Sequence, residues 1–369
     1  MSRMNRVLFT AGVLLMLVSS AAMAFEGFPN PVRSYTLTGG DAFNANFISD
    51  SNDAYTWFGR IYRNADHVRV TWWPSSTAQG LGLIKSEESY GAYMLHLQEG
   101  SFYDKQLSGE YNHFTLGYGY AFENFDLGVV YNRQGTSQEV GGTKMSETYN
   151  AFGAGITYDM DDETQIDATF AFVTGKTDDG VDGNDDPEST GMNFGARAFK
   201  AWREDLTIVP VFVFNTWKDK LGDAEDKTTM FGAGLGFDYT INEDNDLYVF
   251  ASFQNSKETL DDGTDTAEYK MTALPGIGAA VEHEFTDMFT VRMGATKNWE
   301  KYEEPGTPDG TDTYHSYPWM FTMGMGIAMG DWVIDLELNQ TWLYSAGYWF
   351  HGYDSPQSPI AQIEAKLWF

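Results

Sequence analysis

The residue types that most often carry catalysis are scattered along this chain. Its six histidines form no His-Glu-x-x-His pair, and no Gly-x-Ser-x-Gly turn is present. The nearest combinations are His315 with Asp312, and His351 with Asp354 and Ser355. Surface loops explain these residues equally well, so we expect no enzyme, no catalytic residue and no cofactor.

Little in the sequence indicates a metal site. The chain has no cysteine, which excludes thiolate ligands and disulfides. Residues 178–188 are rich in carboxylates that could hold Ca²⁺ or bridge to lipopolysaccharide through divalent ions, but their spacing differs from that of the calcium-binding loop. We therefore expect a solvated acidic loop and predict no metal site. The net charge of −30 disfavours nucleic acid as a partner.

Charged residues instead follow a period of two. Near the C-terminus the apolar residues Ile363, Ala365, Leu367 and Phe369 alternate with the polar residues Gln362, Glu364 and Lys366. The preceding segment alternates in the same way, with Asp335 and Glu337 on its polar face. A strand with one apolar and one wet face is typical of the wall of a transmembrane β-barrel.

The polar faces of these segments predict a charged lumen. The expected lining residues are Asp167, Arg197, Asp238, Glu282, Arg292, Asp335 and Glu337. Such residues either select a polar permeant or form paired charges that stabilise a filled lumen. Both interpretations remain open at this point.

The ends and composition of the chain indicate export to the outer membrane. Residues 1–24 have basic residues, a short apolar run and a final Ala-Met-Ala, as a Sec-type signal peptide does. Aromatic residues make up 16% of the chain although its mean hydropathy is −0.37. This combination suits a wall between lipid and water. We predict a signal peptide over 1–24, an N-terminal segment over 25–66 and an outer-membrane barrel over 67–369.

The connections alternate between short and long. Reading back from the C-terminus, residues 343–359 are a long link, 330–331 a short one, 300–316 long and 284–287 short. Further back, residues 218–227 and 134–147 are also predicted as long links. Outer-membrane barrels show this parity, with short turns at the periplasm. The fold expected is all-β, an antiparallel up-and-down barrel of about 14 strands (range 12–16). An additional hairpin formed by residues 68–73 and 80–85 would raise the count from fourteen to sixteen.

Residues 25–66 do not alternate, and their aromatic content favours packing over a free tail. They form either a periplasmic segment or a plug, or hatch, folded into the lumen. This segment resembles the start of the FadL-type family of fourteen-stranded barrels and its PorV-like relatives, with Gly39, Gly40, Asp50, Asn52 and Asp53 in the matching places. The resemblance implies uptake of hydrophobic small molecules or a secretion-accessory role.

The closing residues, AKLWF, resemble the C-terminal signal that the barrel-assembly machinery recognises, which Leu367 and Phe369 would carry. Outer-membrane lipid and lipopolysaccharide are the other expected partners. The function expected is passive transport of small molecules, which the family resemblance suggests are hydrophobic. The alternative is a non-conducting structural or secretion-accessory barrel that presents acidic, aromatic loops, such as residues 345–360, to a partner.

Overall fold

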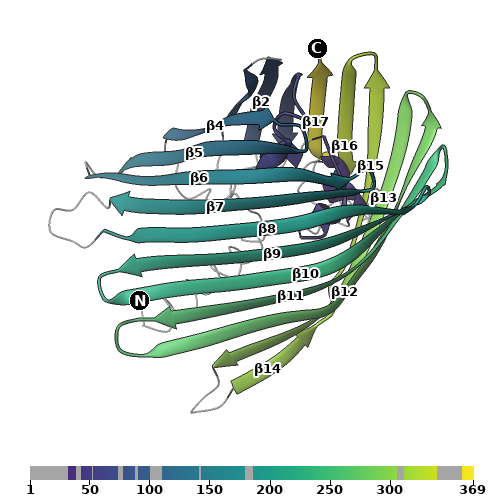
Figure 1. Ribbon diagram of the computed structural model, residues 1–369. Coiled ribbons are helices and arrows are strands. Elements are labelled where there is room, and N and C mark those ends of the chain that lie inside the picture. Colours follow the sequence, from purple (N-terminus) through teal and green to yellow (C-terminus); the bar gives the residue numbers. More distant parts are fainter. Residues whose placement is uncertain are drawn as a thin grey trace, which may run out of the picture.

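The computed structural model describes residues 32–38, 43–51, 53–73, 78–87, 90–99, 110–140, 143–178, 186–305, 311–338 and 360–369. Their strands form one antiparallel sheet that closes on itself (Figure 1). Closure is direct, because the first strand pairs with the last from His67 opposite Trp368 to Trp72 opposite Ile363. The strand formed by residues 311–316 pairs on one side only, and every other described strand has hydrogen-bonded neighbours on both sides. The predicted all-β barrel is confirmed.

The strands are, in chain order, β1 His67–Trp73, β2 Ala78–Glu87, β3 Gly91–Glu99, β4 Glu110–Ala121, β5 Phe125–Val140, β6 Thr143–Asp161, β7 Thr164–Asp178, β8 Glu188–Arg203, β9 Leu206–Leu221, β10 Ala224–Asn242, β11 Asn245–Asp261, β12 Thr266–Thr286, β13 Phe289–Pro305, β14 Thr311–Ser316, β15 Trp319–Met329, β16 Trp332–Leu338 and β17 Ile360–Trp368.

The wall has sixteen positions although the sheet contains 17 strands. Both β14 and β15 pair with β13. β14 pairs with residues 300–305 of β13 and β15 with residues 289–297, so together they fill one position. The extra hairpin that would raise the count from fourteen to sixteen is present as β1 and β2. The higher of the two counts is therefore the observed one.

The predicted alternation decides which side chains face lipid. In β17, Glu364 and Lys366 are buried toward the lumen, whereas Phe369 just beyond the strand is 56% exposed. Large apolar residues such as Phe152 and Phe170 are exposed on the outer face. An apolar outer surface on a closed sheet is stable only against lipid.

Several links predicted as long external loops are hydrogen-bonded hairpins instead. β5 and β6 pair out to Val140 and Thr143, and β9 and β10 pair out to Leu221 and Ala224. β12 reaches 21 residues, about twice what crossing the hydrocarbon needs. In these outlying parts of the strands, apolar and polar residues no longer alternate, because both faces of the strand meet water. The backbone pairing nevertheless continues. Opposite these hairpins lie short turns such as Arg203 to Leu206, which we assign to the periplasmic side.

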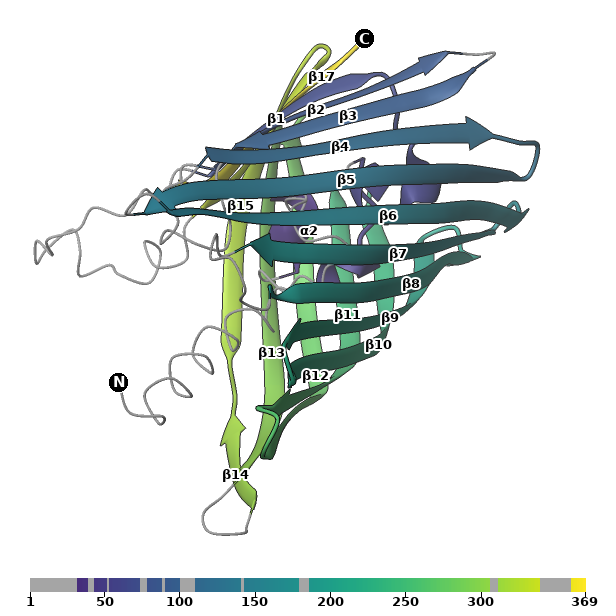
Figure 2. The ribbon, with the colours of Figure 1, turned by 90° about the vertical axis from the view of Figure 1, so that its left-hand side faces the viewer.

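The described part of residues 32–66 lies inside the barrel (Figure 2). It forms the helix α2 (Val32–Leu37) and the 3-10 helices η1 (Asn44–Phe47), η2 (Asp53–Tyr55) and η3 (Phe58–Arg60). α2 contacts β13, β15 and β16, η1 contacts β9 and β10, and η3 contacts β5 and β6. The segment thus touches the wall on several sides. No helix in the described ranges is long and apolar enough to cross a membrane.

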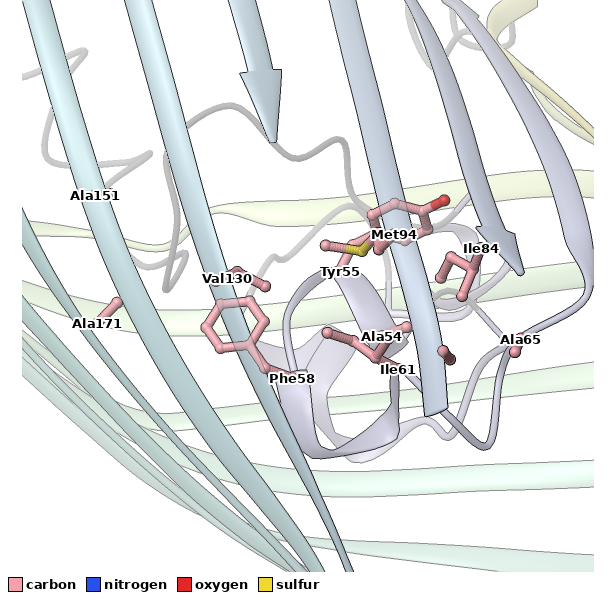
Figure 3. Packing of buried hydrophobic residues seen from close by; sticks show 11 residues of the cluster. Ala54, Tyr55, Phe58, Ile61, Ala65, Ile84, Met94, Val130, Ala151 and Ala171 are labelled. Atoms are coloured by element: carbon pink, nitrogen blue, oxygen red, sulfur yellow. The ribbon is translucent and has the colours of Figure 1, made fainter. Parts of the chain in front are cut away.

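The segment and the wall share an apolar core (Figure 3). It contains Ala54, Tyr55, Phe58 and Ile61 from the segment and Ile84, Ala92, Met94, Val130, Ala151 and Ala171 from the strands. These four side chains from the segment are at most 1% exposed, so burying them favours the docked position.

Candidate functional site: the contact between the N-terminal segment and the barrel wall

Glycines on the inner face of the wall create room for the segment. A Cβ atom on Gly128 would lie under 3.0 Å from the backbone oxygen of Phe58, and one on Gly155 would come equally close to the backbone of η3. The ring of Phe47 fills the space above Gly234 and Gly236 in the same way. Because a glycine lets another chain approach the strand closely, these positions fix where the segment sits.

A cluster of four buried charges, which we call the first cluster, joins η2 and η3 to β7 and β8. Arg197 donates hydrogen bonds to Asp167 over 2.8 Å and to Asp53. Arg60 donates to Asp167 over 2.8 Å and lies 3.3 Å from Asp53. Each carboxylate is therefore shared by one arginine of the wall and one of the segment. Thr157 adds a hydrogen bond to Asp167 over 2.7 Å.

Aromatic rings flank this first cluster and exclude water from it. The guanidinium of Arg197 lies 4.4 Å from the ring centroid of Trp57 and 4.8 Å from that of Phe199. Burial and the neighbouring Arg197 lower the pKa of Arg60 from its usual range, but a guanidinium stays protonated in proteins. The first cluster is thus charged, buried and complete, and removing any one member leaves an unbalanced charge.

A second cluster joins α2 to β12, β13 and β16. Arg33 donates two hydrogen bonds to Glu282, over 2.8 and 2.9 Å, and one to the hydroxyl of Tyr248 over 3.1 Å. Arg292 pairs with both Glu282 and Asp335. Glu282 therefore bridges an arginine of the segment and an arginine of the wall, as Asp167 does in the first cluster.

A third cluster lies where the barrel closes. Arg69 of β1 is 3.0 Å from Glu364 of β17, and Lys366 is 3.2 Å from the same carboxylate and 3.9 Å from Asp50 of the segment. The Arg69 guanidinium sits 4.8 Å from the ring centroid of Tyr55. Burial raises the pKa of the Tyr55 hydroxyl to about 12, although Arg69 acts in the opposite direction. Tyr55 is therefore neutral at physiological pH.

Five of the predicted lumen residues belong to these clusters: Asp167 and Arg197 to the first, and Glu282, Arg292 and Asp335 to the second. The other two do not. Glu337 is 5% exposed and Asp238 is partly buried, and neither forms an ion pair among the described residues. The pairing favours the interpretation of paired charges in a filled lumen.

Sequence reasoning missed the partners that the N-terminal segment contributes. Arg33, Arg60 and Arg63 all form ion pairs with carboxylates of the wall. A signal was available, because these arginines fall close together in a chain whose net charge is −30. Arginine concentrated before the first strand of an acidic barrel indicates that the segment meets an acidic interior.

The remaining candidates for chemistry do not assemble. Asp312 and His315 both lie on β14, three positions apart, so they point to opposite faces of the strand. His351, Asp354, Ser355 and most of the acidic stretch after Asp178 lie outside the described residues, as do residues 1–24, Gly39, Gly40 and Asn52. Within the parts that the structure describes, no group of three or more His, Asp or Glu side chains could hold a metal ion.

An apolar exterior, a closed sheet and a charged interior are stable together when the barrel spans a lipid membrane. Lipid satisfies the outer face, and the sheet satisfies its own backbone hydrogen bonds. The chain is an outer-membrane β-barrel.

Comparisons with known proteins give distant structural matches only. No protein-family model matches the sequence, and no curated protein matches it. Among solved structures, the alcaligin outer-membrane receptor FauA from Bordetella pertussis shares 10% identity at a TM-score of 0.46, covering 73% of this chain and 59% of that one. BauA, the ferric preacinetobactin receptor from Acinetobacter baumannii, shares 11% at 0.48, covering 74% and 53%.

CdiB from Acinetobacter baumannii shares 8% identity at a TM-score of 0.47, covering 82% of this chain and 59% of that one. The chain thus spans little more than half the length of these proteins. The FadL-type family is not confirmed by these matches, and likeness at this distance carries no conclusion about ligand or mechanism.

Proposed function

We propose that this barrel transports small polar molecules across the outer membrane and that residues 25–66 act as a plug in its lumen. The observation that carries the proposal is how the segment is held. Two carboxylates of the wall, Asp167 and Glu282, are each shared between an arginine of the segment and an arginine of the wall. If the segment leaves, each of these two carboxylates keeps an arginine partner on its own wall and is not left as an unpaired charge.

The hydrogen bonding of the segment also favours a part that can be released. Among the described residues, one backbone-to-backbone hydrogen bond joins residues 32–66 to the rest of the chain, from the Phe369 N–H to the Asp66 carbonyl. Other contacts, such as Thr296 to the Thr38 carbonyl over 2.7 Å, run through side chains. A docked segment of this kind can leave without unzipping a strand.

The lining favours a polar permeant over a hydrophobic one. Beyond the segment, toward the external side, the inner face carries buried polar residues such as Asn215, Ser252, Ser256 and Asn298. A hydrophobic solute would offer no hydrogen bond to Ser252 Oγ or Asn298 Oδ1, which have no partner among the described residues. The hydrophobic permeant implied by the FadL-type resemblance therefore lacks support from the lining.

A second function rests on the packing of the segment. Phe47 stacks on Phe250 with 5.5 Å between ring centroids, and Phe58 is fully buried. A lumen filled this closely also suits a non-conducting barrel that serves as a structural or secretion-accessory platform. The predicted docking loop, residues 345–360, lies largely outside the described residues.

Contact with lipopolysaccharide remains a proposal that the outer surface supports. Lys176, Lys218, Lys257 and Lys301 lie at the same distance along β7, β9, β11 and β13 from the periplasmic start of each strand. Each forms an ion pair with a nearby carboxylate, so these four lysines and their partners make up a band of mixed charge. Ammonium groups suit phosphates directly, and carboxylates suit the divalent ions that bridge them.

Flux measurement separates the two functions. Purified full-length protein, a variant lacking residues 25–66, and Arg60→Met are each reconstituted in vesicles, and uptake of small neutral and charged solutes is measured. We expect little flux for the full chain, more for Arg60→Met, and most for the deletion. Absence of flux in all three, with circular dichroism showing folded barrels, would remove transport and leave the non-conducting platform.

A further inference from the structure

Charge is sorted by face on the external halves of β9 to β14. The inner face carries Asp219, Asp226, Glu258, Glu300, Glu304 and Asp312, as the register with buried inner residues such as Asn215 and Asn298 shows. The lysines of the same region, Lys218, Lys220, Lys227, Lys257, Lys270, Lys297 and Lys301, all occupy the alternate positions and face outward. The described inner face there has no basic side chain.

The inward carboxylates repel one another. Asp226 stands directly opposite Asp219 in the register of β9 and β10. Both Asp219 and Glu258 act electrostatically on Asp226. One carboxylate oxygen of Asp226 and one of Glu258 are buried without a hydrogen-bond partner among the described residues. Placing like charges together at low solvent access is unfavourable unless a cation joins them or one carboxyl group takes up a proton.

Two further oxygen atoms lie close together on the same inner face, two residues along β13 from Glu300 and six residues along β11 from Glu258. Ser252 of β11 and Asn298 of β13 flank Gly276 of β12, and a Cβ atom on Gly276 would lie under 3.0 Å from Ser252 Oγ and from Asn298 Oδ1. Each residue is 6% exposed, and neither oxygen has a hydrogen-bond partner among the described residues. Buried unsatisfied acceptors are rare in proteins, so these atoms are suited to accept from a donor group of a bound molecule. They share the inner face with Glu300 and Glu258.

Aromatic rings accompany the carboxylates. Trp217 donates to Asp219 over 2.8 Å, Tyr302 to Glu300 over 2.8 Å and Tyr314 to Glu304 over 3.0 Å. Tyr302 and Tyr314 stack with 4.7 Å between their ring centroids. Rings held beside carboxylates recognise organic cations, because the ring face and the negative charge both attract an ammonium group.

We propose that this inner face binds an organic cation with several ammonium groups. The acidic face crosses five gaps between neighbouring strands, or about 24 Å, which suits an extended polycation. A single metal ion fits less well, because no described group of three or more acidic or histidine side chains could hold one. This names a ligand class for the proposed transport function and deepens it, but the binding itself does not require transport.

The test measures the binding of spermidine to the full chain in detergent by calorimetry at low salt. The inner variant is Asp226→Asn with Glu258→Gln. The matched control, Glu225→Gln with Glu268→Gln, removes the same charge from outward positions on β10 and β12. We expect the wild type to bind, the inner variant to bind at least about tenfold more weakly, and the control to change less than about twofold.

Three results would overturn the site: no binding by the wild type, equal loss in the inner and control variants, or Ca²⁺ alone binding more tightly than spermidine. Flux measured on the same preparations keeps the two proposals apart. Binding without flux would leave the site standing and remove transport, whereas flux without binding would do the reverse.

Discussion

Replacing Arg197 by methionine should release the N-terminal segment while leaving the barrel folded. The side chain of Arg197 is 0% exposed and pairs with both Asp53 and Asp167. Its loss leaves two buried carboxylates with Arg60 alone. Methionine keeps the apolar contact with Trp57, so the change acts mainly on charge.

The size of the effect follows from the burial. Breaking a buried ion pair by removing one partner costs about 3–5 kcal/mol. Since about 1.4 kcal/mol corresponds to a factor of ten, the undocked population should rise about 100-fold to about 4,000-fold. A second change, Asp53→Asn, removes the unbalanced charge and leaves the Arg60–Asp167 pair intact, so the double variant should recover most of this loss.

Cysteine labelling measures the undocked population. The chain has no cysteine, so Ala54→Cys introduces a single thiol at a position that is 0% exposed when the segment is docked. The labelling rate with a maleimide is then compared with and without Arg197→Met. Arg203→Met serves as the control, because Arg203 is largely exposed and, among the described residues, pairs with Asp205 alone beside a periplasmic turn.

The result that refutes the reasoning is clear. If Arg197→Met changes the labelling rate by less than about threefold, as a surface change would, the first cluster does not hold the segment in place. Circular dichroism in detergent verifies that each variant keeps its strands.

Three further predictions concern packing, lipid contact and assembly. Gly128→Ala should raise labelling at the Ala54→Cys position, since overpacking against η3 costs about 1–3 kcal/mol, whereas Gly135→Ala, where the nearest atom to the new Cβ is 3.8 Å away, should not. Leu235→Arg, on the lipid face, should lower the free energy of unfolding in vesicles by about 2–4 kcal/mol in a urea titration; an unchanged midpoint would contradict the assigned outer face. Phe369→Ala should reduce the heat-modifiable, assembled form in cells yet refold normally in detergent, and normal assembly in cells would argue against the C-terminal signal.

The sequence determined the wall and its faces. Alternation such as that of residues 362–369 follows from strand geometry alone, because successive side chains must point to opposite sides. The periplasmic turns could also be predicted, because an apolar strand must end where the lipid ends. Five of the predicted lumen charges entered the ion-pair clusters for the same reason: their parity placed them inside.

Only the tertiary structure decided what those charges meet. Asp53 and Asp167 are far apart in the chain, and nothing local links either to Arg197 or Arg60. The external ends of the strands were mistaken for loops because both of their faces are wet there, which removes the alternation but not the backbone pairing. The choice between fourteen and sixteen strands likewise depended on β1 pairing with β17, a contact between the two ends of the barrel that no local pattern encodes.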